Sequence, residues 1–404
     1  MEKINLKNLD KSSWELYRFE EIAKRVSETV DPNTTELEVY VGLEHIDPQD
    51  IHIRRFGTPK DVSGGKLKCY PGDVIFGKRR AYQRKAAVVE FEGICSAHAF
   101  VFRANADVID PKLFPFFLHS DQFMHRMVDI SVGGLSPTIN WSDLKHQQFL
   151  LPPKAEQSHL AELFWAMDEV IEKDIELLKK LNSSYSGLIN HYMIHGNYGS
   201  DGDIVKTDCG LLDKRIGTML LKGCLLEKPM YGANAASKPF ETHSPRYIRI
   251  TDIDEEGCLV DEDIVSIDTT DYGKYILKDN DFLFARTGNT VGKTLIFREK
   301  MGNCVFAGYL IRFRLNQERL LPKFLFYFTK SLKYEAFKRK LIKIGAQPNI
   351  NSEEYQTITL PALSIQEQEI IIEKIDAIRA RIELLQMKIL DGKSLQKTLI
   401  NQIF

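Results

Sequence analysis

The feature that most constrains this chain is an internal repeat, in which the same short patterns occur twice, in the same order and roughly 210 residues apart. One pattern is a loop that begins with Gly, has Pro at its fourth position and ends in Ile-Asn, at Gly134–Asn140 and Gly345–Asn351. The other matching pairs are YVGLEHID and YIRITDID, PGDVIFGK and DNDFLFAR, HAFVFR and LIRFR, and DPKLFPFFLHS and LPKFLFYFTKS. So long a collinear series indicates duplication, and the 404 residues are expected to contain two copies of one unit.

Each copy is predicted to contain an α+β domain of about 150 residues. Segments such as DVIFGK, HAFVFR, DFLFAR and YLIRFRL are short, aromatic and β-branched, and several alternate with period two, which favours strands. Pro111 and Pro322 stand where Pro fits the first turn of a helix, ahead of amphipathic runs. Strands and helices are therefore expected to mix within each copy.

Each copy closes with a segment predicted as one long helix, and both segments contain Leu-Ile-Asn near their ends. Apolar residues recur in them at four-three spacing, a narrow stripe suited to one partner helix rather than to a broad core. The first stripe comprises Leu160, Phe164, Met167, Ile171, Leu178 and Leu181, and the second comprises Ile371, Ile375, Ile378, Ile382, Leu385 and Ile389. Asp174 is a polar position within the first stripe, and Gly392 and Gln396 interrupt the second. The simplest arrangement is an antiparallel coiled coil; the alternative is that each helix packs only on its own domain.

The expected fold class is therefore α+β, with two similar globular domains joined by two long antiparallel coiled-coil helices and related by a pseudo-twofold internal repeat. About 40 residues at 1.5 Å per residue make each helix roughly 60 Å long. The expected segments are a first globular domain at 1–151, a central long helix at 152–198, a flexible linker at 199–205, a second globular domain at 206–360 and a C-terminal long helix at 361–404.

Composition places the chain among ordinary globular proteins and argues against secretion or a membrane span. It is 43% hydrophobic and 27% charged, and its net charge of −2 leaves nucleic acid open as a partner, because phosphate binding needs only a local patch. The six cysteines are scattered without a Cys-x-x-Cys pair, so we expect reduced side chains in a cytoplasmic protein. No apolar run is long enough to span a bilayer, and the first residues lack the apolar core of a signal peptide.

No pattern of catalytic or metal-binding residues emerges from the sequence. There is no Gly-rich phosphate loop, no Gly-rich strand–turn–helix for a nucleotide cofactor, and no cluster of His, Cys, Asp and Glu at metal spacing. LPPK at Leu151 lacks the Asn and the aromatic residue of an amino-methyltransferase motif. The stretch from Asp252 to Asp271 holds nine carboxylates, which fit a solvated loop better than a metal site. We therefore assign no catalytic residue and no metal ligand, with catalytic residues brought together only by the fold as the alternative.

Binding chemistry is more evident, in two hairpins at matching positions of the copies. The first, Phe76–Lys85, contains five basic residues and no acid, and an arginine fork there can grip phosphate or bind the major-groove edge of guanine. The second, Ala285–Lys293, has two glycines that allow its backbone to approach a ligand closely. The candidate DNA-binding residues are Lys78, Arg79, Arg80, Tyr82, Arg84 and Lys85 in the first hairpin and Arg286, Thr287, Asn289 and Lys293 in the second. The alternative is a merely solvated surface.

Two further segments admit both a structural and a DNA-binding interpretation. The run Lys333–Lys343 nets +4 and could be only the solvated face of a helix. In the two Gly-x-x-Pro loops, Pro restricts the residue before it, and Asn140 and Asn351 are good helix N-caps, which favours an architectural role. Ser136 and Gln347 are the candidates for DNA contact in these loops.

The doubled pattern resembles the specificity (S) subunit of type I restriction–modification enzymes, in which two variable target-recognition domains are each followed by a long helix. The resemblance covers essentially the whole chain and rests on the Gly-x-x-Pro loops, the paired helices, and the Pro-bearing lead-ins to Glu156-Gln157 and Glu367-Gln368. WELYRFE near the N-terminus and YGANAASKP before the strand at Tyr247 also fit. The chain departs from a perfect repeat because the first hairpin lacks the glycines of the second, and LSIQEQ is longer than KAEQ.

The resemblance implies that each globular domain binds one half of an asymmetric, bipartite site on double-stranded DNA from the major groove, and that the coiled coil sets the gap between the half-sites. It implies two modification subunits, docked on the exposed sides of the helices, which methylate adenine with S-adenosylmethionine. Two restriction subunits that use ATP and Mg can join them. The chain itself is then no enzyme and binds no cofactor. Two alternatives stay open: a duplicated coiled-coil scaffold that binds protein partners without contacting DNA, and a stand-alone nuclease or methyltransferase.

Overall fold

Two compact units are present in the computed structural model, which describes residues 11–342 and 347–404. Unit 1 contains residues up to Glu176 together with Gln386–Phe404, and unit 2 contains Leu177–Leu385. Each of the two long helical segments is therefore divided between the units. Gly345, which begins the second Gly-x-x-Pro loop, and Lys343, which ends the basic run, lie outside the described residues.

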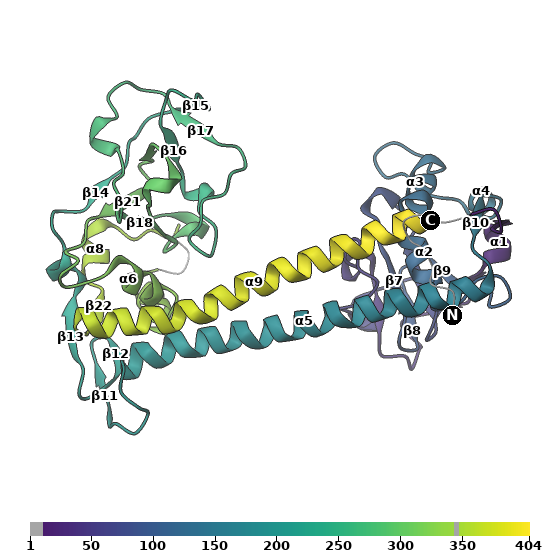
Figure 1. The fold of residues 1–404 in the computed structure, drawn as a ribbon, viewed down its shortest axis with the longest axis horizontal. Helices are drawn as coiled ribbons and strands as arrows, with labels where there is room; N and C mark the ends of the chain where they lie inside the picture. Colours follow the sequence, from purple (N-terminus) through teal and green to yellow (C-terminus); the bar gives the residue numbers. More distant parts are fainter. Residues whose placement is uncertain (1–10, 343–346) are drawn as a thin grey trace. The chain divides into compact units, whose positions relative to one another are not determined.

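Unit 1 mixes short strands and helices, as the repeat predicts (Figure 1). Its four-stranded sheets have the strand orders β2-β9-β6-β7 and β3-β5-β8-β4, and β1 pairs with β10. The strands are β1 (Glu15–Arg18), β2 (Ala23–Val26), β3 (Thr29–Val30), β4 (Tyr40–Val41), β5 (Lys66–Cys69), β6 (Val74–Gly77), β7 (Ala86–Val88), β8 (Gly93–Cys95), β9 (Ala99–Ala104) and β10 (Gln148–Leu151). The short α-helices are α1 (Phe19–Ile22), α2 (Phe114–His119), α3 (Asp121–Asp129) and α4 (Trp141–Leu144).

Unit 2 repeats this plan with the orders β14-β21-β18-β19 and β15-β17-β16-β20, and with β13 paired to β22. Its strands are β11 (Ile204–Thr207), β12 (Gly210–Asp213), β13 (Gly217–Leu220), β14 (Met230–Tyr231), β15 (Ser237–Pro239), β16 (Arg246–Ile248), β17 (Val265–Ile267), β18 (Phe282–Ala285), β19 (Thr294–Ile296), β20 (Cys304–Phe306), β21 (Leu310–Phe313) and β22 (Thr359–Ala362). Its short α-helices are α6 (Pro322–Thr329), α7 (Leu332–Leu341) and α8 (Ser352–Gln356). One four-stranded sheet differs between the units: β5 lies beside β8 in unit 1, whereas β17 lies beside β16, the equivalent of β4, in unit 2. Unit 2 also has a two-stranded sheet of β11 and β12.

An ion pair with a buried carboxylate occurs at the same place in both units and explains two of the matching patterns. Asp73 contacts Arg103 at 2.7 Å, and Asp281 contacts Arg314 at 2.8 Å. The carboxylates are 1% and 2% exposed, and each also accepts the backbone N–H three residues earlier. Hydrogen bonding to these carboxylates raises the pKa of both arginines. The pair links the start of β6 to β9 in unit 1, and the start of β18 to the end of β21 in unit 2. The Asp of PGD and DND and the Arg that ends HAFVFR and LIRFR therefore have a structural role.

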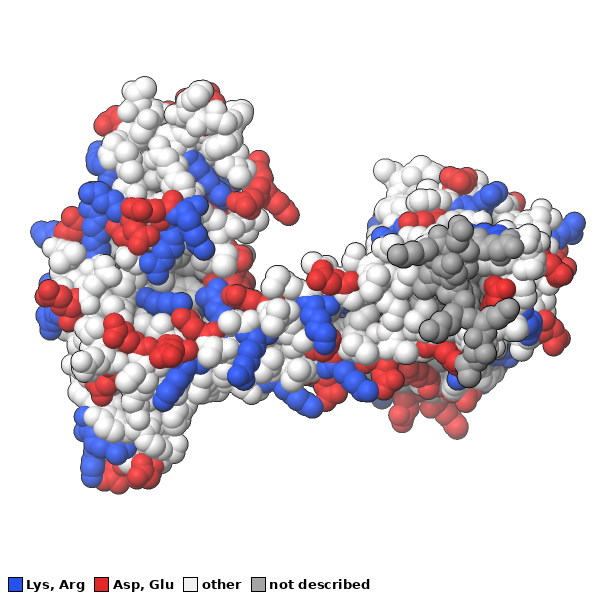
Figure 2. All heavy atoms as spheres, in the orientation of Figure 1, with Lys and Arg blue, Asp and Glu red and all other residues white. Residues whose placement is uncertain are grey.

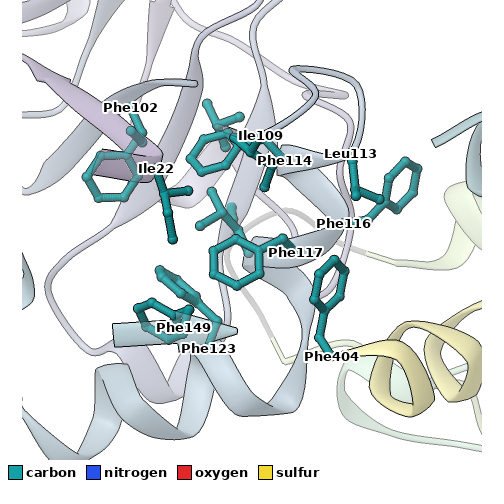
Figure 3. Close-up of a cluster of buried hydrophobic side chains, with 14 of the residues drawn as sticks. Ile22, Phe102, Ile109, Leu113, Phe114, Phe116, Phe117, Phe123, Phe149 and Phe404 are labelled. Carbon is teal, nitrogen blue, oxygen red and sulfur yellow. The ribbon is translucent and has the colours of Figure 1, made fainter. Parts of the chain in front are cut away.

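Aromatic side chains dominate the core of unit 1 (Figure 3). Phe117 on α2 lies with its ring centroid 5.4 Å from Phe123 and 5.3 Å from Phe149, in tilted and edge-on contacts. Phe404, the last residue of the chain, packs on the same ring at 5.3 Å. Such contacts contribute about 0.5–1.5 kcal/mol each beyond the area they bury. The end of the sequence is therefore part of the core built by the first copy.

The long helices α5 (Lys154–His195) and α9 (Ile365–Ile403) lie side by side and antiparallel within each unit (Figure 1). Every residue of the two predicted apolar stripes is buried or half-buried. In unit 1, the polar stripe position Asp174 pairs with Lys388 at 2.9 Å. A Cβ added to Gly392 would stand 3.2 Å from the Ile171 side chain, so this interruption lets the helices approach closely.

In unit 2 the same two helices meet through different side chains. The Lys374 ammonium on α9 lies 5.5 Å from the centre of the Tyr192 ring on α5. The Asn197 side-chain amide, just beyond α5, donates to the Glu367 carbonyl at 2.9 Å. The pairing of late α5 residues with early α9 residues shows the antiparallel direction.

A fully buried glutamine secures the start of each long helix. Gln157 Oε1 accepts the Asp110 N–H at 2.7 Å, and its Nε2 donates to two backbone carbonyls, of Val108 and Pro152. Gln368 repeats all three bonds, accepting the N–H of Leu321 at 2.9 Å and donating to two carbonyls of unit 2. The Gln of the Glu-Gln pattern is therefore a structural link between the helix and the globular part of the unit, because its buried side chain satisfies backbone groups of the globular part and of the lead-in to the helix.

An asparagine secures the end of each long helix. Asn190 on α5 accepts the N–H of Leu332 at 2.8 Å, and Asn401 on α9 accepts the N–H of Asp121 at 2.8 Å. These N–H groups belong to the first residues of α7 and α3, which have no partner within their own helices. The residues next to the asparagines enter the cores: Ile189, Tyr192 and Met193 in unit 2, and Ile400, Ile403 and Phe404 in unit 1. Each unit thus contains the helix end of the other copy.

The buried glutamine gives a stability prediction. Gln157→Ala should lower the free energy of unfolding by roughly 2–4 kcal/mol, because it leaves one buried N–H and two buried carbonyls without their partner. Urea denaturation followed by circular dichroism measures the loss. Glu156→Ala, in the same helical turn, is the control and should cost less than about 1 kcal/mol. Equal losses in the two variants would contradict the role given to the Gln157 hydrogen bonds.

Candidate nucleic-acid and partner interfaces

The basic hairpin of unit 1 connects β6 to β7 through a 3₁₀ turn, Ala81–Gln83. The Gly77 N–H donates to the Lys85 carbonyl at 2.9 Å and closes the hairpin. Arg80 and Arg84, which flank the 3₁₀ turn, have left-handed backbones with φ of 57° and 53°. Residues with a Cβ rarely adopt this conformation, because the Cβ crowds the backbone.

The matching hairpin of unit 2 connects β18 to β19 through a 3₁₀ turn, Gly288–Thr290. The Ala285 N–H donates to the Lys293 carbonyl at 2.9 Å. Gly288 and Gly292 have φ of 68° and 87°, at the positions that Arg80 and Arg84 occupy in unit 1. The two hairpins therefore have the same left-handed backbone at these two positions. They differ only in the residue there, which is arginine in unit 1 and glycine in unit 2.

The Gly-x-x-Pro loops pack against these hairpins through the same backbone bonds in both units. In unit 1, the N–H of Arg80 donates to the Pro137 carbonyl at 2.7 Å, and the N–H of Ile139 donates to the Lys78 carbonyl at 3.0 Å. In unit 2, the N–H of Gly288 donates to the Pro348 carbonyl at 2.9 Å, and the N–H of Ile350 donates to the Arg286 carbonyl at 2.8 Å. The asparagines that end the loops stand at the N-cap positions of α4 and α8, but only the Asn351 side chain accepts a backbone N–H of its helix, that of Glu354. Hairpin and loop therefore form one surface in each unit.

In unit 1 this surface presents two arginines with no carboxylate partner among the described residues. Arg79 Nε and Arg80 Nε both donate to the Ser136 hydroxyl, at 2.7 and 3.2 Å, and both side chains are exposed. Lys78 lies over the Phe100 ring, 5.2 Å from its centroid. Burial, and then the nearby Arg25 charge, lowers the pKa of Lys78. Cations without acidic neighbours are suited to a polyanion.

The remaining candidates of the first hairpin are engaged differently. Arg84 forms an ion pair with Asp121 and donates to the His119 carbonyl at 3.3 Å. Lys85 Nζ donates to the Leu43 carbonyl at 2.5 Å. These two side chains therefore have structural partners, whereas Tyr82 is 54% exposed beside the arginines.

The matching surface of unit 2 is less charged. The Arg286 guanidinium lies over the Tyr231 ring, 4.8 Å from its centroid, and its Nε donates to the Asn349 side-chain oxygen at 3.3 Å. Lys293 pairs with Glu255 at 2.9 Å. Thr287 is half-buried and Asn289 is exposed on the 3₁₀ turn, and both are neutral hydrogen-bonding groups. The two units therefore carry unlike side chains on the same backbone frame.

An exposed ring stands next to each hairpin, and sequence reasoning missed it. Tyr309 is 61% exposed, and its carbonyl accepts the N–H of Arg286 at 3.0 Å. His98 occupies the matching turn of unit 1, between β8 and β9, and is also exposed. It lines a polar hollow of about 590 Å³ together with Lys60 and Lys66. Both rings stand just before the matching patterns HAFVFR and LIRFR, but only the fold shows that they adjoin the hairpins.

The other charged segments find partners inside unit 2. In the basic run, Lys333 donates to the Cys209 carbonyl at 2.9 Å and Lys338 pairs with Glu335 at 2.7 Å, which favours the interpretation as a helix face. In the acidic stretch, Arg249 contacts Asp252 and Asp263, at 2.8 and 3.3 Å. Within residues 11–342 and 347–404, no group of His, Cys, Asp and Glu is arranged to hold a metal ion. No described helix is long and apolar enough to cross a membrane.

A groove between α5 and α9 in unit 1 is the candidate partner site. Its volume is about 490 Å³, and the missing side chain of Gly392 helps to open it. The groove is lined by Leu163, Ala166, Met167, Val170, Ile171, Asp174, Lys388, Asp391, Gly392 and Leu395. Val170 and Leu395 are 52% and 55% exposed, which is high for apolar residues that adjoin one another. Most of these lining residues are apolar, and Figure 2 shows charged side chains of both signs along the face of the long helices that is in view.

Residues 210–391 match the family model for the Type I restriction modification DNA specificity domain. Over 169 residues the chain is 25% identical to the EcoDI specificity subunit of a type I restriction enzyme from Escherichia coli, covering 41% of this chain and 37% of that relative. It is 21% identical over 369 residues to the StySPI specificity subunit of Salmonella potsdam, covering 86% of this chain and 71% of the relative.

Among solved structures, a chain from a study of complex assembly and conformational transition in the type I R-M system superposes with a TM-score of 0.61. It is 18% identical in sequence, and the match covers 97% of both chains. At this identity the likeness shows a common fold. The family model covers only the second copy, but the hydrogen bonds shared by the two units extend the same plan to the first copy.

Proposed function

We infer that this chain belongs to the family of specificity subunits of type I restriction–modification systems and is the DNA-recognition subunit of such a complex. The observation that carries this inference is the pair of hairpin–loop surfaces, which share their backbone bonds and differ in the side chains they present. Two surfaces of common shape and unlike chemistry fit two different half-sites of one DNA target. A scaffold that binds only proteins has no need of the two exposed arginines of unit 1, which have no carboxylate partner among the described residues.

The proposed division of labour assigns the chemistry to other subunits. S-adenosylmethionine, ATP and Mg are ligands of the modification and restriction subunits, and this chain contributes binding and orientation only. Two modification subunits dock along the exposed sides of α5 and α9, with the apolar groove around Gly392 as one contact. An apolar strip between two helices accepts the apolar face of a further helix, because ridges of side chains pack into such grooves.

The gap between the half-sites is proposed to depend on the length of the long helices. The target-recognition domains are proposed at 1–151 and 206–360, and α5 and α9 span 42 and 39 residues between their anchored ends. Both ends of each helix are held by side-chain hydrogen bonds, through Gln157 and Asn190 in α5 and through Gln368 and Asn401 in α9. A helix held at both ends can act as a spacer of set length.

Exchange of one recognition domain tests the proposed function. Replacing residues 1–151 by those of another specificity subunit should change one half-site of the methylated sequence and leave the other half-site unchanged. The measurement is sequencing of methylated sites in cells that express the chain with its modification subunits. A change in both half-sites would contradict the assignment of one half-site to each domain.

Lengthening the helices tests the spacer. The variant carries seven additional residues after Glu176 in α5 and seven after Leu385 in α9. Insertions of this length keep the four-three spacing and add about 10 Å to each helix. The gap should grow by about three base pairs, at ~3.4 Å per pair. Methylated-site sequencing reports the gap, and seven residues added after Gly199, ahead of β11, are the control. An unchanged gap in the double insertion would reject the spacer.

A charge placed in the groove tests the docking site. Val170→Glu should weaken binding of the modification subunit by roughly tenfold or more, because the carboxylate would lose water in an apolar contact. The side chain is half exposed, so the fold of unit 1 should be retained. Gly273→Glu, in unit 2 where an added Cβ meets no atom within 4 Å, lies away from both long helices and is the control, which should bind normally. Titration followed by gel filtration measures the affinity, and equal binding by both variants would remove the groove from the interface.

A further inference from the structure

We propose that Arg79 and Arg80 bind guanine in the half-site of unit 1, and that Ser136 is the positioning residue that aims their guanidinium forks. This inference rests on the proposed function and adds to it the class of base that one recognition surface selects. It concerns two adjacent side chains of the hairpin and one hydroxyl of the Gly-x-x-Pro loop.

The geometry of the three side chains is the first observation. Arg79 Nε and Arg80 Nε donate to the same atom, Ser136 Oγ, at 2.7 and 3.2 Å. A hydrogen bond at Nε fixes the direction of the guanidinium plane and leaves its terminal nitrogens available to a ligand. Ser136 is itself held in place, because the loop carbonyl of Pro137 accepts the N–H of Arg80 at 2.7 Å. The forks are therefore oriented before any ligand arrives.

The charges of this arrangement are the second observation. Two guanidinium groups gather around one neutral oxygen, with no carboxylate partner among the residues that the structure describes. Acids are not scarce in the chain, which has 56 acidic and 54 basic residues. Other arginines of the same unit are compensated, such as Arg54 by Asp50 and Arg103 by Asp73. The uncompensated pair is most stable when an acceptor-rich ligand lies against it.

The backbone of Arg80 is the third observation. Its φ of 57° is left-handed, and the matching position in unit 2 holds Gly288, which adopts such a backbone without steric cost. The first copy thus keeps an arginine where the conformation favours glycine. An unfavourable backbone that persists at a candidate site points to a role for the side chain.

The surroundings favour a base edge over a phosphate. Leu135, next to Ser136, is 98% exposed, and Val132 at the base of the loop and Tyr82 on the hairpin are 56% and 54% exposed. Apolar tips beside two forks fit the interior of the major groove, where base edges and thymine methyl groups lie, better than they fit the phosphate backbone. Guanine presents two adjacent acceptors there, N7 and O6, and an arginine fork binds both at once.

Unit 2 does not have this arrangement of two arginines around a serine hydroxyl. The positions that match Arg79, Arg80 and Ser136 hold Thr287, Gly288 and Gln347. The arginine that remains, Arg286, uses its Nε on Asn349 and lies over the Tyr231 ring. The guanine contacts are therefore assigned to one half-site only, and the other half-site is an internal reference for the experiment.

The test uses the whole chain assembled with its modification subunits, and determines the methylated sequence for each variant. Arg79→Lys and Arg80→Lys keep the charge and lose the fork. Each should relax discrimination for guanine at one position of one half-site by about tenfold or more. Ser136→Ala should relax the same positions more weakly, and Ser136→Thr, which keeps the hydroxyl, should restore them. Arg18→Ala removes an exposed arginine of β1 and should leave the sequence unchanged.

The possible outcomes separate this inference from the proposed function. The inference is overturned if the wild-type half-site of unit 1 contains no guanine, or if the lysine variants keep its full specificity. Binding that weakens equally for all sequences would instead assign the arginines to phosphate and also overturn it. In these cases a bipartite sequence is still methylated by the wild-type complex. A wild-type complex without sequence preference would refute the proposed function itself.

Discussion

The structure depends on the side-chain hydrogen bonds that hold both ends of the long helices. Gln157 and Gln368 each satisfy three backbone groups at a helix start, and Asn190 and Asn401 each satisfy the first N–H of a short helix at a helix end. Each bond is worth only about 1 kcal/mol net, but an unsatisfied buried group costs more. The same bonds therefore fix where each helix enters and leaves a globular unit. Without them the apolar stripes would specify that two helices pair, but not at which register.

A second constraint is that the recognition surfaces share one frame. The left-handed turns at Arg80 and Gly288 and the bonds to Pro137 and Pro348 place the hairpins alike in both units. The ion pairs of Asp73 and Asp281 secure the strands beneath them. On such a frame, changing exposed side chains alters binding chemistry while the buried contacts stay the same. This separates specificity from stability within each unit.

Much of this plan could be predicted from the sequence, because it is written in local patterns. The long helices, their apolar stripes and the N-cap positions at Asn140 and Asn351 follow from spacing and residue type, and the structure contains them. Features that depend on contacts between distant segments could not be predicted. Nothing local marks Arg84 as the partner of Asp121, so a structurally engaged arginine was counted among the candidates for DNA.

Two further features were hidden for physical reasons. The two hairpins looked different because a Gly-rich turn is recognisable from its sequence, whereas arginine in a left-handed backbone is not. The exposed rings of His98 and Tyr309 adjoin the hairpins only because β9 and β21 pair with β6 and β18. Strand pairing over this distance in sequence has no local signal, and side chains brought together by it are found only in the fold.

The position of Phe404 in the core of unit 1 has a consequence for biosynthesis. The ring that covers Phe117 belongs to Phe404 in the second copy, although most of unit 1 is made first. An apolar surface of the early-made domain therefore stays uncovered during synthesis until Phe404 has emerged from the ribosome. Unit 2, whose helix end Ile189–Met193 precedes its sheets, is complete once Leu385 has emerged. The order of synthesis and the order of completion are thus reversed.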